Sequence, residues 1–454
     1  MQELEKELAS VSQFLCEDHL AQAMEQRVKY VRELSKEIPF YARKYKELGI
    51  DPDEIRTPQD LLKAYQKGLY TTGDDLPYLT TDYDVFRQYF ITSGTSGKGK
   101  IVAITRDDLK RATRQCERSY SSFINENDII LNCFPSSPAV SGTVTIEGIS
   151  PFPIKLFHAS AQTLSDVEMF LTYYHMFKPS VIFGLTTSVY RLPIKLIEKG
   201  INSQELSINK ILTGGEPSSI EKRKTISKEF GEAEVYDWYA SSENMIIAYE
   251  RTPLSNEYEV TTPDTLLFLV KDSNEVSEGE IGDVLITNLY EIGENPHMIL
   301  LNYKIGDWAK CLRKRKDHSV SLISDIRRWA AYLAGAKLDP TEIEKAVEEL
   351  KEGLYRDKLS GEYTVINYHD KEDRKAVGEI RVESKKKLSP EEKEEVAKKL
   401  REEIYLTNIP VKTLVEEIKD AKLLIEITDP GELYKGYEKH IKPGKPIRLL
   451  NFLT

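Results

Sequence analysis

Cysteine, methionine and tryptophan are scarce in this chain of 454 residues, which contains four, six and three of them respectively. The cysteines are far apart, at Cys16, Cys116, Cys133 and Cys311. Zinc sites and disulfide frameworks use closely spaced cysteines. We therefore expect these thiols to be core or surface residues, and we predict no structural zinc.

Long apolar runs and an excess of positive charge are also missing. No stretch of eighteen apolar residues occurs, and the acidic start MQELEKELASVSQFL lacks the basic end and apolar centre of a signal peptide. The formal net charge of −11 argues against general binding of nucleic acid. We expect a soluble cytoplasmic protein with no nucleic-acid or membrane partner.

The composition is otherwise that of a globular protein, with 40% hydrophobic and 30% charged residues. The length allows two or three domains. Lysine, glutamate, isoleucine and tyrosine are abundant while cysteine and methionine are few, a balance that points to a thermophilic source.

The order of local patterns predicts an α/β protein with two domains. Residues 1–70 are mainly helical in pattern, and from about Phe86 to Thr287 short β-rich runs alternate with amphipathic helical ones. After about Ser324, charged helical segments alternate with short strands. We expect a large N-terminal domain over residues 1–326, with mixed sheets covered by helices, and a small α+β domain over residues 327–454.

The segment TSGTSGKGK at residues 92–100 has the composition of a loop that holds a polyphosphate. Glycine lets backbone N–H groups approach an anion, hydroxyls add neutral donors and lysine adds positive charge. A Walker loop needs Ser or Thr after its lysine and opens into a helix, but here Ile101 follows and begins a β-prone run. The sequence therefore predicts a hairpin between two strands, the alternative being a flexible surface loop.

Four further segments combine residue types that suit a nucleotide, although each has a simpler explanation. TGGEP at 213–217 is a turn after a strand, YDWYASSE at 236–243 places aromatic rings, hydroxyls and a carboxylate together, and YKIGD at 303–307 ends in one acidic residue. GKPIR at 444–448 is close to the C-terminus. Taken singly, they fit an ordinary turn, an aromatic core strand, a hairpin and a solvated tail.

Taken in order, these segments resemble those of the adenylate-forming acyl-CoA ligases, specifically the phenylacetate-CoA ligase branch. The loop at 92–100 is similar to that branch's SSGTTGKPT, GEP at 215–217 to its GxEP, YDWYASSE to its YDxYGxSE, and YKIGD to its YRTGD. GKPIR matches the GKxxR that carries the family's catalytic lysine. The resemblance spans nearly the whole chain.

The resemblance implies a site for ATP and Mg²⁺ in which Lys445, Glu243 and Ser96 are catalytic. Glu243 is expected to hold Mg²⁺, Asp307 the ribose, and Lys445 the reacting carboxylate and α-phosphate. The residues expected to bind the nucleotide are Ser93, Gly94, Thr95, Ser96, Gly97, Lys98, Gly215, Glu216, Pro217, Tyr236, Asp237, Trp238, Tyr239, Ala240, Ser242, Asp307, Arg327 and Gly335.

The implied reaction converts a carboxylic acid and ATP into acyl-AMP and pyrophosphate, after which coenzyme A takes the acyl group. Residues 133–143, with Phe152 and Phe157, are expected to line an acyl pocket for an aryl or medium aliphatic acid. The alternatives are transfer to a protein thiol or another nucleophile, and a relative that binds nucleotide without turnover. The resemblance also implies that the small domain is mobile and that the protein is a homodimer.

One segment departs from the family pattern. DIRRW at 325–329 aligns with the branch's GRxDD, which carries an ATP-contacting arginine and the hinge between the domains. Ile326 stands at the arginine position and Trp329 at the hinge. Arg327 or Arg328 is the substitute that we expect.

Overall fold

The computed structural model describes residues 17–91, 101–137, 139–216, 218–328, 331–334, 336–338, 340–353, 355–437 and 449–451. Three helices come first, α2 (Glu17–Lys36), α3 (Pro39–Leu48) and α4 (Pro58–Gln66). Proline opens α3, Gly49 in the left-handed conformation (φ 61°) ends it, and a capping box of Thr57 and Asp60 begins α4. None of the helices in the described part is both long and apolar enough to cross a membrane.

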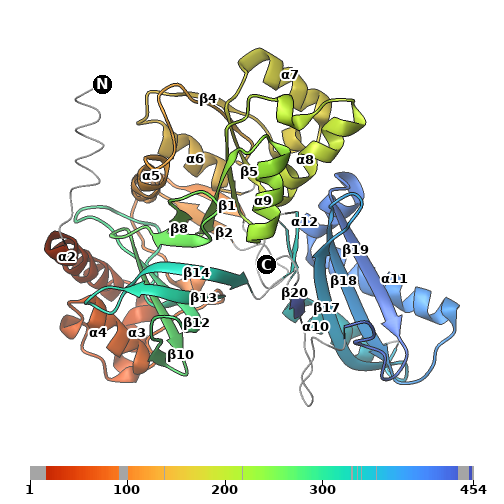
Figure 1. Cartoon of the computed structure of the whole chain (residues 1–454). Helices are drawn as coiled ribbons and strands as arrows, with labels where there is room; N and C mark the ends of the chain where they lie inside the picture. Colours follow the sequence, from red (N-terminus) through yellow and green to blue (C-terminus); the bar gives the residue numbers. More distant parts are fainter. Residues whose placement is uncertain are drawn as a thin grey trace.

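A mixed sheet dominates the large domain (Figure 1). Its strand order is β11-β10-β12-β13-β14-β9-β8-β7-β6-β5-β3-β4. The strands from β4 to β7 run parallel, and pairing is antiparallel from β7 to β11. The parallel strands are β3 (Ile129–Asn132), β4 (Lys155–His158), β5 (Val181–Leu185), β6 (Lys210–Gly214) and β7 (Glu234–Ser241).

Helices cover both faces of the parallel half. Successive side chains of a strand point to opposite faces, and both faces carry apolar side chains here that must be buried. Ile130, Phe183 and Leu212 belong to the core that includes residues of α5 and α6, whereas Leu131 and Ile182 pack with residues of α7, α8 and α9. These helices are α5 (Arg106–Tyr120), α6 (Ser141–Ile149), α7 (Val167–Phe177), α8 (Thr186–Glu198) and α9 (Ile220–Glu229).

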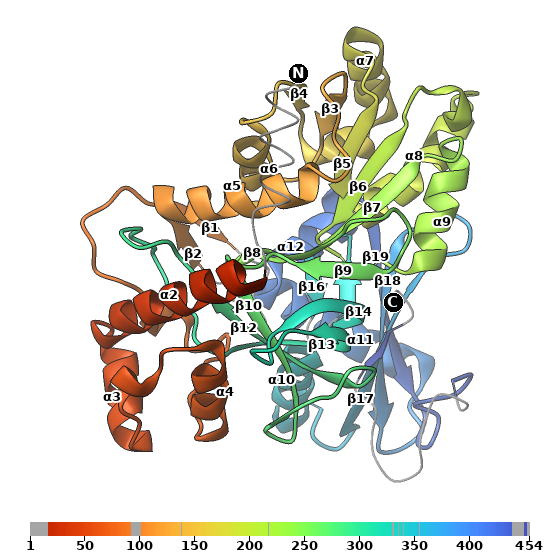
Figure 2. The same cartoon turned by 60° about the vertical axis from the view of Figure 1, so that its left-hand side comes forward.

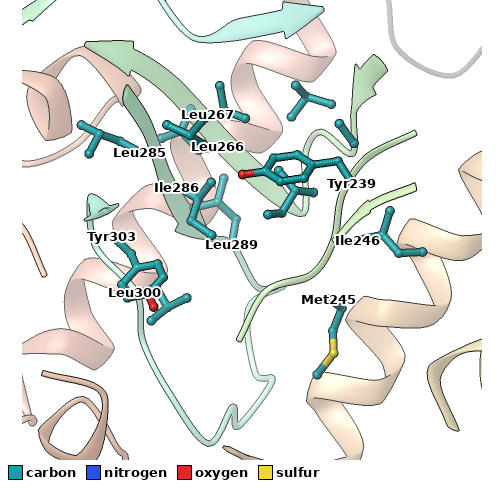
Figure 3. Packing of buried hydrophobic residues seen from close by; sticks show 14 of the residues in the cluster. Tyr239, Met245, Ile246, Leu266, Leu267, Leu285, Ile286, Leu289, Leu300 and Tyr303 are labelled. Carbon is teal, nitrogen blue, oxygen red and sulfur yellow. The ribbon is translucent and has the colours of Figure 1, made fainter. Parts of the chain in front are cut away.

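The antiparallel half contains no helix between its strands in the described residues 245–328. The expected alternation of strands and helices up to residue 287 therefore stops at β7, because turns and a loop over residues 289–302 connect the later strands. Leu266, Leu267, Leu285 and Ile286 form the core of this half (Figure 3). The strands are β8 (Met245–Glu250), β9 (Glu257–Val260), β10 (Thr265–Lys271), β11 (Asn274–Glu275), β12 (Ile281–Asn288), β13 (Tyr303–Lys314) and β14 (Val320–Arg328).

A small α+β domain follows, as the sequence predicted. Its four-stranded sheet has the order β19-β18-β17-β20, with a β15-β16 hairpin beside it. Its own core begins at Ala331, whereas β14 of the large sheet continues to Arg328. The elements are β15 (Ala331–Leu333), β16 (Ala336–Leu338), α10 (Pro340–Glu352), β17 (Leu359–His369), β18 (Ala376–Ser384), α11 (Pro390–Thr407), α12 (Ile409–Lys412), β19 (Ala421–Thr428) and β20 (Leu449–Asn451).

Candidate active site

Two strands flank the segment that the sequence suggested as a polyphosphate loop. β1 (Gln88–Ile91) and β2 (Ile101–Ile104) pair antiparallel, with Ile91 opposite Ile101. The predicted strand-loop-strand arrangement is therefore confirmed at its flanks. The candidate residues Ser93, Gly94, Thr95, Ser96, Gly97 and Lys98 lie outside the described residues, as do Pro217, Gly335 and Lys445.

Side-chain contacts connect this hairpin to the segment that leads into β13. Arg87 Nε donates to His297 Nδ1 at 3.1 Å, and Thr105 Oγ1 donates to the Asn295 carbonyl at 3.0 Å. The open end of the hairpin, formed by the start of β1 and the end of β2, is therefore held against residues 295–297.

Tyr239 of β7 and Asp307 of β13 meet in the interior. The Tyr239 hydroxyl donates to Asp307 Oδ2 at 2.8 Å, and Tyr239 is almost fully buried while Asp307 is 9% exposed. This hydrogen bond fixes the carboxylate, which can accept further hydrogen bonds from a ligand hydroxyl. Tyr239 and Asp307 are two of the residues that the sequence predicted to bind the nucleotide.

Glu243 lies in the turn after β7, next to the start of β13. Its carboxylate accepts a long hydrogen bond of 3.4 Å from Tyr303, whose ring is visible beside Leu300 in Figure 3. Burial and the charge of Glu243 raise the pKa of Tyr303, so its hydroxyl remains a donor. No cationic side chain pairs with Glu243 in the described part of the chain.

The free coordination capacity of Glu243 suits Mg²⁺, which takes one or two carboxylates and completes its shell with water and phosphate oxygens. No group of three or more His, Cys, Asp or Glu residues able to hold a metal occurs among the described residues. A Mg²⁺ ion at Glu243 would therefore depend on nucleotide phosphates for further ligands.

The side chains of Tyr236, Asp237, Trp238 and Tyr239 do not converge on one surface, because β7 alternates. The Tyr236 ring stacks on Phe123 at 4.4 Å, and Trp238 Nε1 donates to Ser119 Oγ at 2.6 Å. Both belong to a buried aromatic cluster beside α5. Ala240 and Ser242 follow at the partly exposed end of β7.

Asp237 is hydrogen-bonded inside the sheet. Its carboxylate accepts from Thr213 Oγ1 at 2.7 Å and from the Tyr258 hydroxyl at 2.8 Å. The Tyr239 side chain, by contrast, reaches another candidate, Asp307.

Gly215 and Glu216 form the turn after β6. Gly215 has φ 79°, and a Cβ there would lie 2.8 Å from Leu185. The buried Glu216 carboxylate accepts from the backbone N–H of Thr187 at 3.3 Å and from the Thr187 hydroxyl. A carboxylate here neutralises the positive N-terminal end of α8, a structural role distinct from the nucleotide contact expected for Glu216.

Arg327 lies in β14, where its backbone is opposite Trp308. Arg328 is opposite Asp307. Of the two arginines proposed as substitutes for the missing family arginine, Arg328 is thus the register neighbour of the candidate ribose-binding carboxylate.

The small domain touches the large one along α8 and α9, a contact that no local sequence pattern predicted. Thr187 Oγ1 lies 3.2 Å from His369 Nε2, and Arg191 of α8 forms an ion pair with Asp420. Arg374 makes two 2.6 Å bonds to Glu229 of α9. We call these contacts the docking interface; Figures 1 and 2 both show the strands of the small domain beside these helices.

Comparison with known proteins identifies the class. A family model described as AMP-binding enzyme matches residues 52–289, more than half of the chain, and the chain belongs to this family. Phenylacetate-coenzyme A ligase of Pseudomonas putida is 21% identical over 333 residues, which cover 69% of this chain and 72% of that protein. The enzyme of Thermus thermophilus is 22% identical over 359 residues, or 74% and 76% of the two chains.

A solved structure shows the same fold over nearly the whole chain. 2-Hydroxyisobutyryl-CoA ligase, in complex with 2-HIB-AMP and CoA in the thioesterification state, matches with a TM-score of 0.74 and 16% identity, over 97% of this chain and 91% of that chain. The same ligase in its postadenylation state gives a TM-score of 0.60 and 15% identity, over 96% and 90%. The predicted α/β fold and the resemblance to phenylacetate-CoA ligase-like adenylate-forming enzymes are confirmed.

Proposed function

We propose that this protein activates a carboxylic acid with ATP, releases pyrophosphate, and transfers the acyl group from acyl-AMP to coenzyme A. The observation that carries the proposal is the Tyr239–Asp307 hydrogen bond of 2.8 Å beside Glu243, in a member of the AMP-binding family whose β1-β2 hairpin flanks a loop of phosphate-binding composition. Aryl and medium aliphatic acids are the substrates that we infer.

In the first step, a carboxylate oxygen attacks the α-phosphorus, a P–O bond forms, and the bond to pyrophosphate breaks. Such a step depends on positioning and on neutralising negative charge. Asp307, held by Tyr239, would accept hydrogen bonds from the ribose hydroxyls. Residues 93–98 would hold the β- and γ-phosphates, and Lys445 would bridge the carboxylate and the α-phosphate. Mg²⁺, held by Glu243, would supply positive charge beside the phosphates.

In the second step, the thiolate of coenzyme A attacks the acyl carbonyl, and the bond to AMP breaks. Because Lys445 belongs to the small domain, that domain must change position between the steps, which is a rigid-body motion. We assign the docking interface to the second step, and the higher TM-score to the thioesterification state supports this assignment.

The proposal is tested by ATP–pyrophosphate exchange with Mg²⁺ and a panel of aryl, aliphatic and amino acids, repeated with coenzyme A while AMP and thioester are followed. We expect acid-dependent exchange and thioester formation. Exchange without thioester would redirect the second step to another acceptor. ATP binding without exchange for any acid would contradict the proposal.

Lys445→Ala separates the two steps. We expect it to lower adenylation about 100- to 1000-fold, the usual effect of removing a group that stabilises transition-state charge, while thioester formation from supplied acyl-AMP is largely spared. Lys442→Ala, three residues earlier, is the matched control and should behave as wild type. Equal loss of both half-reactions in Lys445→Ala would refute the assigned role.

A further inference from the structure

A polar network that the proposed mechanism does not use lies at the carboxyl ends of β3 and β4. Asn132 ends β3, His158 ends β4, and Ser136 follows in the loop after β3. Asn132 Nδ2 is 3.0 Å from His158 Nδ1, and His158 Nε2 is 2.8 Å from Ser136 Oγ. Asn132 is fully buried, whereas His158 and Ser136 are partly exposed.

The hydrogen-bond directions in this network follow from one backbone group. The Phe134 N–H donates to the Asn132 side chain at 3.1 Å, so the atom facing it is Oδ1. The NH₂ group of Asn132 therefore faces His158 and donates to Nδ1. A neutral imidazole that accepts at Nδ1 carries its proton on Nε2, and His158 consequently donates to Ser136 Oγ.

The protonation state of His158 agrees with this assignment. Partial burial lowers its pKa and outweighs the opposing effect of the Asn132 backbone, which keeps the ring neutral near pH 7. With Nε2 already protonated, His158 is unable to take a proton from Ser136. The arrangement therefore differs from that of a serine nucleophile, which needs an unprotonated Nε2.

The Ser136 hydroxyl is left as an oriented hydrogen-bonding group. It accepts from His158 and makes no other hydrogen bond among the described residues, so its proton and one lone pair are available. No charged side chain of the described part of the chain hydrogen-bonds to Ser136 or His158. A neutral hydroxyl or carbonyl group is the natural partner.

The hydroxyl lies at the same edge of the sheet as Glu243, because β3 and β7 are parallel and both residues follow the carboxyl ends of their strands. Phe134, two residues before Ser136, stacks on Trp238 of β7 at 6.1 Å, and a Cβ on Gly214 would lie 3.7 Å from its ring. Ligands in open α/β sheets bind beyond the carboxyl ends of the strands, where these residues lie. Gly142 permits the close packing, since a Cβ there would be 2.1 Å from Ser136 Oγ.

The aromatic residues expected to line an acyl pocket are engaged elsewhere. Phe157 stacks on Phe177 of α7 at 4.1 Å, and Phe152 packs edge-on against Tyr120 of α5 at 6.0 Å. Phe157 and Phe152 therefore pack against α7 and α5, whereas Ser136 supplies a polar group within residues 133–143, the segment expected to line the acyl pocket.

We propose that Ser136, held by His158 and Asn132, selects acids that carry a neutral hydroxyl or carbonyl group on the acyl chain. This inference rests on the proposed function, because it concerns the acid that is activated. His158 and Asn132 act as positioning residues, and Ser136 touches the substrate.

Matched acid pairs test the inference. The wild type and Ser136→Ala are compared by ATP–pyrophosphate exchange with 3-hydroxybutyrate against butyrate and with 4-hydroxyphenylacetate against phenylacetate. We expect the wild type to prefer the hydroxy acid of at least one pair in kcat/KM. Ser136→Ala should lower kcat/KM for that acid about three- to tenfold, the net effect of one hydrogen bond, and leave the parent acid unchanged. Ser150→Ala, at the exposed end of α6, is the control.

The outcomes separate this inference from the proposed function. If Ser136→Ala lowers exchange equally with both acids of each pair, or with neither acid, the inference is overturned. The proposed function still stands in that case. If no acid supports exchange, the function fails, and saturation-transfer NMR with the same acids decides the inference. A signal from the hydroxy acid that Ser136→Ala removes supports it, and equal signals overturn it.

Discussion

Two buried aspartates, each surrounded by basic side chains, have different structural roles in this protein. Asp264 lies inside the large domain and is fully buried, while Asp420 belongs to the small domain and is 6% exposed. The chemistry of the two sites is similar. What differs is whether the partners belong to the same core as the carboxylate.

Asp264 joins segments that are distant in the sequence but share one core. It accepts from Arg27 of α2 at 2.7 Å, from Arg114 of α5 at 2.8 Å, and from Arg118 of α5. Burial alone would raise the pKa of Asp264, but the three arginine charges outweigh burial and hold the pKa well below its ordinary value. This network thus stabilises the fold of the large domain.

Asp420 finds its partners in the other domain. It pairs with Arg191 and lies 3.5 Å from Lys195, both on α8, and it accepts from Ser165. If the small domain moves away from α8, these groups return to water and each domain keeps its own core. The comparison shows that similar ion pairs stabilise folding in one place and a domain position in the other.

The largest expected effect comes from Asp264→Asn. Removing this carboxylate leaves three arginines near a neutral amide, and breaking a buried ion pair costs roughly 3–5 kcal/mol. We expect a loss of that order in the free energy of unfolding, measured by chemical denaturation. Because the folded-state pKa is lowered, the wild-type contribution is present above the ordinary carboxyl pKa and is lost as the pH falls below it.

The control for this change is a surface ion pair. Lys199 and Glu168 are 2.7 Å apart with side chains 50% and 73% exposed, and such pairs contribute at most about 1 kcal/mol. Lys199→Ala should therefore change stability little. Equal stability of Asp264→Asn and wild type at neutral pH would show that the network does not stabilise the fold.

Asp420→Asn is expected to have a smaller effect that leaves folding unchanged. It should shift the docking equilibrium by about 1–3 kcal/mol, a typical size for coupling between states, because the freed cations can be solvated by undocking. Small-angle scattering should show a more extended average shape. If the docking interface serves the second step, thioester formation from acyl-AMP should fall while pyrophosphate exchange is retained.

Two outcomes would remove the distinction between the aspartates. One is unfolding of Asp420→Asn at the same denaturant concentration as Asp264→Asn. The other is an unchanged scattering profile together with unchanged thioester formation. Lys199→Ala serves again as the control, since this lysine follows α8 but pairs within the large domain.

Local sequence patterns predicted the parts of the structure that depend on neighbouring residues. The strands on both sides of residues 92–100 and the small α+β domain were predicted from short-range periodicity. The opposite orientation of Trp238 and Tyr239 was also readable from the two-residue period of a strand. The turns between the strands of the antiparallel half carry signals as well, such as Asp272, Ser273 and Asn274.

Long-range pairings were not predictable in this way. The bond between Tyr239 and Asp307 joins residues 68 positions apart, and the contact between Thr187 and His369 spans 182 positions. Family resemblance suggested Asp307 as a ligand, but nothing local showed that Tyr239 would hold it. The docking interface follows no motif, because its residues are assembled only when two separately folded cores meet.

The smallest expected effect is the pH dependence of docking through His369. Burial, followed by the charges of Lys222, Arg191 and Arg374, lowers the pKa of His369 to about 2. The Thr187 hydroxyl, which lies 3.2 Å from His369 Nε2, also donates to the Glu216 carboxylate. A docked His369 is therefore neutral, and its pKa returns toward 6.5 when the small domain undocks.

The direction of the pH effect follows from this difference between the docked and undocked pKa of His369. Above about pH 6.5 the histidine is neutral in both states and docking is unaffected, whereas at lower pH the undocked state gains a proton and docking weakens by about tenfold per pH unit. Scattering between pH 7.5 and 5.5 should show this expansion in the wild type and lose it in His369→Asn. His175→Asn, on the exposed surface of α7, should keep the wild-type response. Because the Asp420 carboxylate, whose pKa is also lowered, stays charged throughout this range, an expansion that persists in His369→Asn would rule out His369 as the group that makes docking pH-dependent.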